Sequence, residues 1–162
     1  MRRTNIERER QRKEDMALRG KVMFPQSPDM INDVAKFHHA FGHPVLWQLS
    51  LPSQKRRDLR SDLISEEANE LIRAIEDNDL TEIADGCADL IYVVIGTCLE
   101  YGIPLDLVWK EVQRSNMAKL GSDGKPLTNS VTGKTMKPAD WQPPAIKELL
   151  LDFTNLQLEN KQ

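Results

Sequence analysis

Acidic side chains occupy positions in this sequence that a helical core would normally give to apolar ones. Glu67 and Glu70 lie on the apolar stripe of a predicted helix that runs from about Pro52 to Asp77. Asp89 lies inside the next predicted helix, from about Leu80 to Tyr101, which is apolar on nearly every side. A lone buried carboxylate is costly and normally protonates. Several such acids are tolerable inside one bundle if a divalent cation neutralises them.

The rest of the sequence also has helical periodicity, and no alternating strand pattern extends beyond a few residues. Further helices are predicted at about 29–41, 104–119 and 145–158. We therefore predict an all-α fold, a bundle of four or five helices. Because the helix at 80–101 should be central and is apolar all round, one chain would not cover it, and we expect oligomerisation to complete the bundle.

Composition limits the classes of protein that the chain can belong to. The 162 residues, 40% hydrophobic and 29% charged, suffice for one globular domain at 25–162, preceded by a charged arm at 1–24. A formal charge of −3 argues against nucleic acid as a partner. Cys87 and Cys98 are expected to be small buried hydrophobes without a disulfide, which predicts a cytoplasmic location. The apolar stretch at 87–99 is too short for a membrane span.

Two acidic clusters lie on the neighbouring helices. The motifs SEEANEL and EIADGCADLIYVV supply Glu66, Glu67, Glu70, Glu82, Asp85 and Asp89. Residues three or four apart share a helix face, and a short turn makes the two helices antiparallel neighbours, so the clusters can face each other. Magnesium is the best fit, because it prefers oxygen ligands and commonly bridges to substrate phosphates. The alternative is that Glu66 and Glu82 are solvated surface acids.

Longer motifs carry a family resemblance. EEANEL, then ADLIYVVIGTCLEYGIPLDLVWKEVQRSNMAKL, DGKP, GK and KPADWQPP, within about Phe37 to Pro144, resemble the MazG-like all-α nucleoside triphosphate pyrophosphohydrolases. That superfamily includes phosphoribosyl-ATP pyrophosphohydrolases and dimeric dUTPases. The resemblance implies homodimers or homotetramers that hydrolyse a (deoxy)nucleoside triphosphate to monophosphate and pyrophosphate with Mg²⁺ or Mn²⁺. Such an enzyme would control the nucleotide pool, acting on dUTP, dGTP or a related nucleotide.

The family pattern of Glu-Glu-x-x-Glu on one helix and Glu-x-x-Asp on the next assigns roles to the acids. Glu66, Glu67 and Glu70 match the first part. If Asp89 is the family aspartate, Gly86 stands where the glutamate is expected, and Asp85 is the substitute; the alternative pairs Glu82 with Asp85. We assign the catalytic role to Glu66 and Glu67, with Glu66 orienting or deprotonating the attacking water. The metal ligands are assigned as Glu67, Glu70, Asp85 and Asp89.

The same resemblance suggests contacts for the phosphates and the base. The segment at 121–144 is predicted to be a long flexible loop that reaches the phosphates, and Phe37 and His38 are assigned to the base. The predicted phosphate-binding residues are Arg114, Asn116, Lys119, Lys134 and Lys137. A solvated basic loop and core aromatic residues are the alternatives. The competing function is a non-enzymatic helical protein that binds nucleic acid or a partner and uses its acids as a structural metal site.

Overall fold

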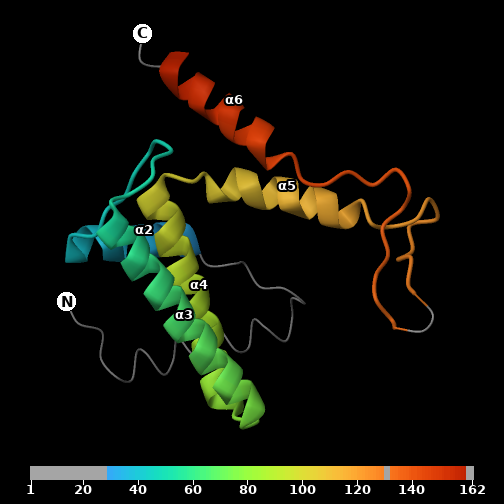
Figure 1. The fold of residues 1–162 in the computed structure, drawn as a ribbon, viewed down its shortest axis with the longest axis horizontal. Coiled ribbons are helices and arrows are strands. Elements are labelled where there is room, and N and C mark those ends of the chain that lie inside the picture. The colour runs from blue at the N-terminus through green and yellow to red at the C-terminus, as the bar shows by residue number, and fades with distance from the viewer. Residues whose placement is uncertain (1–28, 130–131, 160–162) are drawn as a thin grey trace, which may run out of the picture.

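The computed structural model describes residues 29–129 and 132–159, so the predicted arm at 1–24 lies outside the described residues. Its helices are α2 (Met30–Phe41), α3 (Gln54–Glu76), α4 (Leu80–Tyr101), α5 (Leu105–Met117) and α6 (Ile146–Glu159) (Figure 1). The described ranges contain two isolated β-bridges but no strand. The predicted all-α fold is therefore confirmed.

Helices α3 and α4 form an antiparallel pair, and α2 packs across α4 (Figure 1). Asn78, in the turn between the paired helices, has a φ of 57°, a left-handed conformation that asparagine adopts more readily than most residues. Asp79 then caps α4 by accepting a hydrogen bond from the Thr81 backbone N–H at 2.9 Å. The short turn thus fixes which residues of α3 face which residues of α4.

A buried ionic network joins the other end of this pair. Glu100 is fully buried on α4 and accepts hydrogen bonds from Arg56 on α3, one of them from Nε at 2.9 Å. Arg60, only 6% exposed, lies 3.6 Å from the same carboxylate and donates to the Thr97 hydroxyl at 3.0 Å. Burial lowers the pKa of the Arg60 guanidinium, and the nearby Glu100 carboxylate opposes that shift. None of these three charged residues was among the predicted functional residues.

The connection from α2 to α3 is fastened to the end of α4. The Leu46 N–H donates to the Leu99 carbonyl at 2.8 Å, and the Ser50 N–H donates to the Tyr101 carbonyl at 3.1 Å. Gly102 ends α4 with a φ of 64°, and a Cβ there would collide with the Gln48 carbonyl, so both the conformation and the space require glycine. Helix α5 then leaves at 117° to α4.

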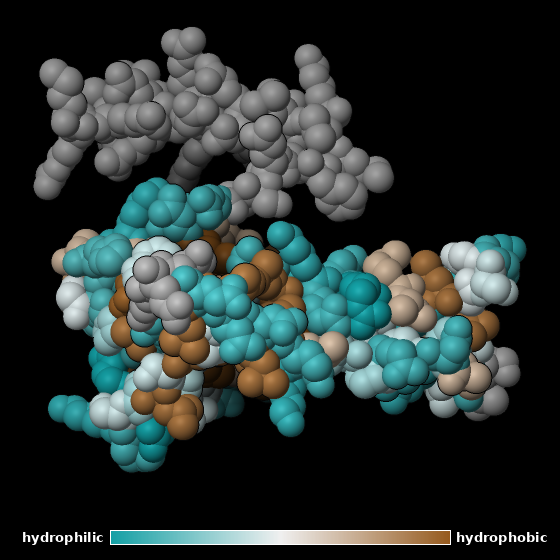
Figure 2. Space-filling view, turned by 90° about the horizontal axis from the view of Figure 1, so that it is seen from above, coloured by the Kyte–Doolittle hydropathy of each residue, from teal (hydrophilic) through white to brown (hydrophobic). Residues whose placement is uncertain are grey.

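Within one chain, α4 is not the buried central helix that its composition predicts. Its buried residues are Gly86, Ile95, Gly96 and Glu100. Apolar side chains such as Ile91 and Tyr92 are 47% and 38% exposed, and Cys87, predicted to be buried, is exposed as well. Hydrophobic side chains accordingly reach the surface among hydrophilic ones in Figure 2. Among the described helices, only α2 and α3 pack extensively on α4, and these two neighbours do not cover every side of it.

No single helix in the described part of the chain is both long and apolar enough to cross a membrane. Helices α4 and α5 reach the length and composition of a span only when taken together, across the sharp bend between them.

The segment at 121–144, predicted to be a flexible loop, has more order than that prediction allows. Its first part is hairpin-like, with antiparallel bridges joining Leu120 to Pro126 and Thr128 to Thr135. The Met136 N–H also donates to the Leu127 carbonyl at 2.6 Å. The hairpin-like part is held by hydrogen bonds between backbone groups. In so short a segment, the pattern of side chains does not predict such pairing.

Candidate functional site

The predicted acidic residues face one another across the α3–α4 pair. Partial burial raises the pKa of Glu67, and so do the neighbouring carboxylates, of which Asp89 on α4 has the largest effect and Asp85 the smallest. Glu66 and Glu70 on the same helix add to the repulsion. Asp89, Glu70, Glu66 and Asp85 are therefore near enough to Glu67 to repel its charge, and their roles as metal ligands or catalytic groups stay predictions. Asp89, however, is exposed and not buried as expected.

Gly86 stands where the family pattern has a glutamate, and it lies at a close approach of the two helices. Gly86 is buried where α4 approaches α3, and a Cβ there would lie 3.2 Å from Leu71 Cα and Cβ. A larger side chain at position 86 would therefore require Leu71 to shift. The close approach also places the neighbouring residue, Asp85, among the carboxylates that act on Glu67.

The cluster has the chemistry of a site for a hard cation. Its donors are carboxylate oxygens, which Mg²⁺ prefers, and their mutual repulsion is the feature that a bound cation would relieve. In residues 29–129 and 132–159, no group of three or more acidic, histidine or cysteine side chains converges closely enough to hold an ion. Glu70 instead lies 3.8 Å from the exposed Arg73. Glu66, Glu70 and Asp89 are all exposed.

Of the predicted phosphate-binding residues, Arg114, Asn116 and Lys119 lie in or just after the last turn of α5, and Lys134 and Lys137 follow farther along the chain. Arg114 donates two hydrogen bonds to Glu111, at 2.8 and 2.7 Å, which with the Ala145 N–H lower the pKa of Glu111 to about 2. Lys119 donates to the Asn116 side chain at 2.7 Å. The ammonium group of Lys137 lies 3.7 Å from the centroid of the Trp141 ring. Lys134 is exposed at the hairpin, where its N–H donates to the Thr132 hydroxyl at 3.4 Å.

One chain does not bring these cations near the acids, so the expectation that α5 ends near them is wrong for a single chain. The acids lie on the halves of α3 and α4 that are near their connecting turn, whereas α5 starts from the opposite end of α4 and leads away (Figure 1). Helix α5 packs with α6, not with the acidic half of α3. The two parts of the predicted site therefore occupy separate regions of the chain.

The residues assigned to the base lie on α2. Phe37 is 38% exposed, stacks on Phe41 at 4.3 Å between ring centroids, and meets the edge of Tyr92 at 5.5 Å. His38 is buried, and its Nδ1–H donates to the Pro44 carbonyl at 2.9 Å. Burial also lowers the pKa of His38, which favours the neutral ring. Phe37 is thus partly accessible to a ligand, whereas His38 is buried and hydrogen-bonded inside the protein.

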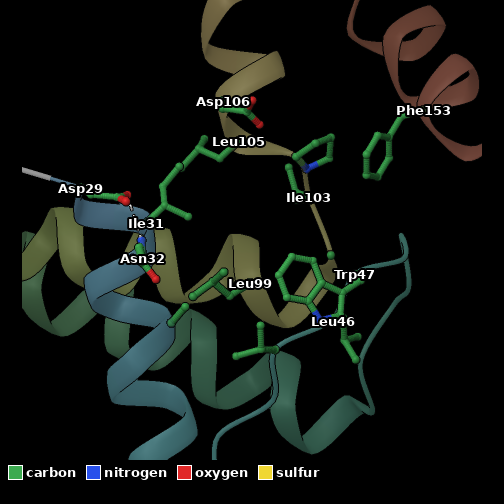
Figure 3. Close-up of a pocket in the computed structure, with 14 residues that line it drawn as sticks. Asp29, Ile31, Asn32, Leu46, Trp47, Leu99, Ile103, Leu105, Asp106 and Phe153 are labelled. Atoms are coloured by element: carbon green, nitrogen blue, oxygen red, sulfur yellow. Dashed lines mark hydrogen bonds between the residues drawn. The ribbon is translucent and has the colours of Figure 1, made fainter. Parts of the chain in front are cut away.

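A cavity of about 440 Å³ is lined by residues other than the predicted metal, phosphate and base contacts (Figure 3). It is lined by the start of α2, the segment at 45–47, the bend between α4 and α5, and Phe153 of α6. Most of the lining is apolar, with Trp47, Leu99 and Ile103 among its residues, and Asp29 and Asp106 add carboxylates. None of the sequence-predicted site residues is part of this lining.

Comparisons with known proteins give the chain its family. A stretch of 77 residues is 42% identical to uncharacterized protein L479 of Acanthamoeba polyphaga mimivirus, covering 45% of this chain and 31% of the viral protein. The chain thus spans about a third of the length of that relative. A crystal structure from Exiguobacterium sp. 255-15, provisionally described as an NTP pyrophosphohydrolase, is 26% identical with a TM-score of 0.42, over 85% of this chain and 100% of the other.

A family model provides the decisive match. Residues 34–116 match the model of phosphoribosyl-ATP pyrophosphohydrolases. The matched range includes α3, α4 and all six acids of the two clusters, and it is just over half of the chain. This protein therefore belongs to the phosphoribosyl-ATP pyrophosphohydrolase family.

Proposed function

We propose that this protein is a metal-dependent pyrophosphohydrolase that cleaves a (deoxy)nucleoside triphosphate between the α- and β-phosphates and so controls a nucleotide pool. The observation that carries the proposal is the group of carboxylates around Glu67, on the two helices that the family match includes. Magnesium or manganese, when bound, would neutralise phosphate oxygens and acidify a water molecule. A cytoplasmic location is part of the same proposal.

The protein's own side chains divide the remaining work. The ion would be held by Glu67, Glu70, Asp85 and Asp89. Without the ion, the negative charge of these carboxylates would repel the polyphosphate. Glu66, which belongs to the same cluster, would orient the attacking water and accept its proton. Lys119, Lys134 and Lys137 would supply positive charge to the polyphosphate. Phosphoryl cleavage depends mainly on such positioning and charge neutralisation.

The test of this function is release of pyrophosphate from a panel of triphosphates that includes dUTP, dGTP and dCTP. We expect turnover with Mg²⁺, loss of turnover with EDTA, and recovery when Mg²⁺ is restored. The product pair should be monophosphate and pyrophosphate, not diphosphate and phosphate. A protein that binds Mg²⁺ but hydrolyses no member of the panel would support the alternative of a structural metal site.

We further propose that the active enzyme is a homodimer or homotetramer in which one chain supplies the acids and another supplies the cations. The separation of the acidic half of α3–α4 from the end of α5 within one chain supports this proposal (Figure 1). The exposed apolar residues of α4, such as Ile91 and Val94, support it as well, because a second chain would bury them.

Mixed oligomers test the shared site. Glu67→Gln and Lys119→Ala should each lose most of the activity as homo-oligomers. When the two variants are co-expressed with different tags and mixed oligomers are isolated, each mixed dimer should contain one intact site. The isolated mixed dimers should then have about half of the wild-type activity, and the randomly assembled mixture before isolation about a quarter. If both essential residues act in the same chain, no mixed oligomer has an intact site, and activity would stay at the level of the single variants.

A further inference from the structure

The side chain of Trp141 makes a specific hydrogen bond at the C-terminal end of α5. Helix α5 ends at Met117, so the Ser115 carbonyl is one of the last four that lack a partner within the helix. The Trp141 indole N–H donates to that carbonyl at 2.8 Å. Ser115 is itself buried, and its hydroxyl donates to the Gln142 carbonyl at 3.1 Å. These two reciprocal hydrogen bonds fix the indole ring against the end of α5.

A second attachment follows directly along the chain. The Ala145 N–H donates to a Glu111 carboxylate oxygen at 2.7 Å, and Arg114 holds the same carboxylate. Arg114 also reaches the Pro143 carbonyl at 3.5 Å. Residues 141–145 are therefore fastened to one face of α5 over about one helical turn, from Glu111 to Ser115. In this structure Arg114 has an anchoring role, in addition to the phosphate contact predicted for it.

The fixed indole ring in turn holds a cation. Lys137 lies with its ammonium group 3.7 Å from the ring centroid, within the range of a cation–π interaction. The backbone N–H of Trp141 donates to the Pro138 carbonyl at 3.1 Å, and this turn brings Lys137 back over the indole ring. Lys137 is otherwise an exposed side chain with four rotatable bonds, so the ring is what restricts it.

We propose that Trp141 is a positioning residue, which holds Lys137 beside Asn116 and Lys119 at the end of α5 so that these groups meet a polyphosphate together. The inference rests on the proposed function for its substrate, but the contact itself does not. Trp141 acts only through Lys137, and it need not touch the nucleotide.

A double-mutant cycle separates this role from a structural one. We expect Trp141→Leu to lower kcat/KM by about fivefold, the order of an exposed cation–π contact, mainly through a higher KM. In a Lys137→Ala background, the same change should lower kcat/KM by less than about twofold, because the positioned group is already absent. Trp141→Phe, which keeps an aromatic face, should recover part of the loss. The matched control combines Trp141→Leu with Lys125→Ala, a lysine of the hairpin that does not contact Trp141. The effects of these two changes on kcat/KM should add.

A purely structural Trp141 predicts a different result. Its replacement would lower kcat/KM equally with or without Lys137, and that additivity would overturn the proposal. A second measurement needs no hydrolysis: with Trp47 and Trp109 replaced by Phe, Trp141 is the single remaining tryptophan of the three. Inorganic triphosphate with Mg²⁺ should change its emission in the Lys137 chain and not in Lys137→Gln. The same response in both chains would refute the proposal. If the emission change depends on Lys137 but the protein hydrolyses no nucleotide, the positioning role is supported and only the proposed hydrolase function is rejected.

Discussion

Glu67→Gln is expected to lower nucleotide hydrolysis by at least about a hundredfold and at the same time to stabilise the metal-free protein. Both effects come from the same charge. The carboxylate would bind the ion during turnover, but without an ion it is repelled by Asp89, Glu70, Glu66 and Asp85, which raise its pKa together with partial burial. Glutamine keeps the size of the side chain and removes the repulsion. Relief of helix-spaced like charges should raise Tm by about 1–2 °C.

The measurements are pyrophosphate release and thermal unfolding in EDTA, with Asp62→Asn as the matched control. Asp62 is an exposed acid of α3. Its replacement should leave turnover and Tm nearly unchanged. Full activity of Glu67→Gln would remove Glu67 from the site. Lost activity with a lower Tm would mean that Glu67 supports the fold, not the chemistry.

The largest loss of stability is expected from Glu100→Gln, about 3–5 kcal/mol, which corresponds to a fall in Tm of about 6–20 °C. The amide cannot neutralise Arg60, which is buried 3.6 Å from the Glu100 carboxylate, and it cannot accept the same charged hydrogen bonds from Arg56. An uncompensated guanidinium would then stay inside the α3–α4 interface. Urea unfolding followed by circular dichroism, at one fixed protein concentration, measures the change.

Asp33→Asn is the matched control for the buried network. Asp33 and Lys36 form an ion pair at 3.1 Å with both side chains more than half exposed, and such pairs contribute about 0–1 kcal/mol. If Glu100→Gln costs no more than this control, water must reach the Arg56–Arg60–Glu100 network in solution.

The sequence predicted the helices well, because apolar periodicity indicates where they run and glycines end two of them, α2 at Gly42 and α4 at Gly102. Helical spacing and a short turn also account for the nearness of Glu66, Glu70, Asp85 and Asp89 to Glu67, which shows in the raised pKa of Glu67. The close contact between Gly86 and Leu71 could not be predicted, because it depends on how the two helices pack.

The buried charge was predicted at the wrong residue. Asp89 was predicted to be buried because the helix around it is apolar, yet it is exposed. Glu100, at the end of the same helix, is fully buried. A signal for Glu100 was present: Arg56 and Arg60 share one face of α3, and Arg56 and Glu100 are equidistant from Asn78 along the chain. The backbone order of the hairpin and the role of Trp141 depend on contacts between distant residues, which periodicity does not encode.

The turn at Asn78 has a consequence for how this chain can change over evolution. Glu67 and Asp89 are equidistant from Asn78, as are Arg56 and Glu100, so one alignment serves both the acids and the buried ionic network. A single residue inserted into or deleted from α3 between Glu70 and Glu76 would rotate both Glu67 and Arg56 by about 100° about the helix axis relative to α4. One such change would disturb the acids and the buried ionic network together.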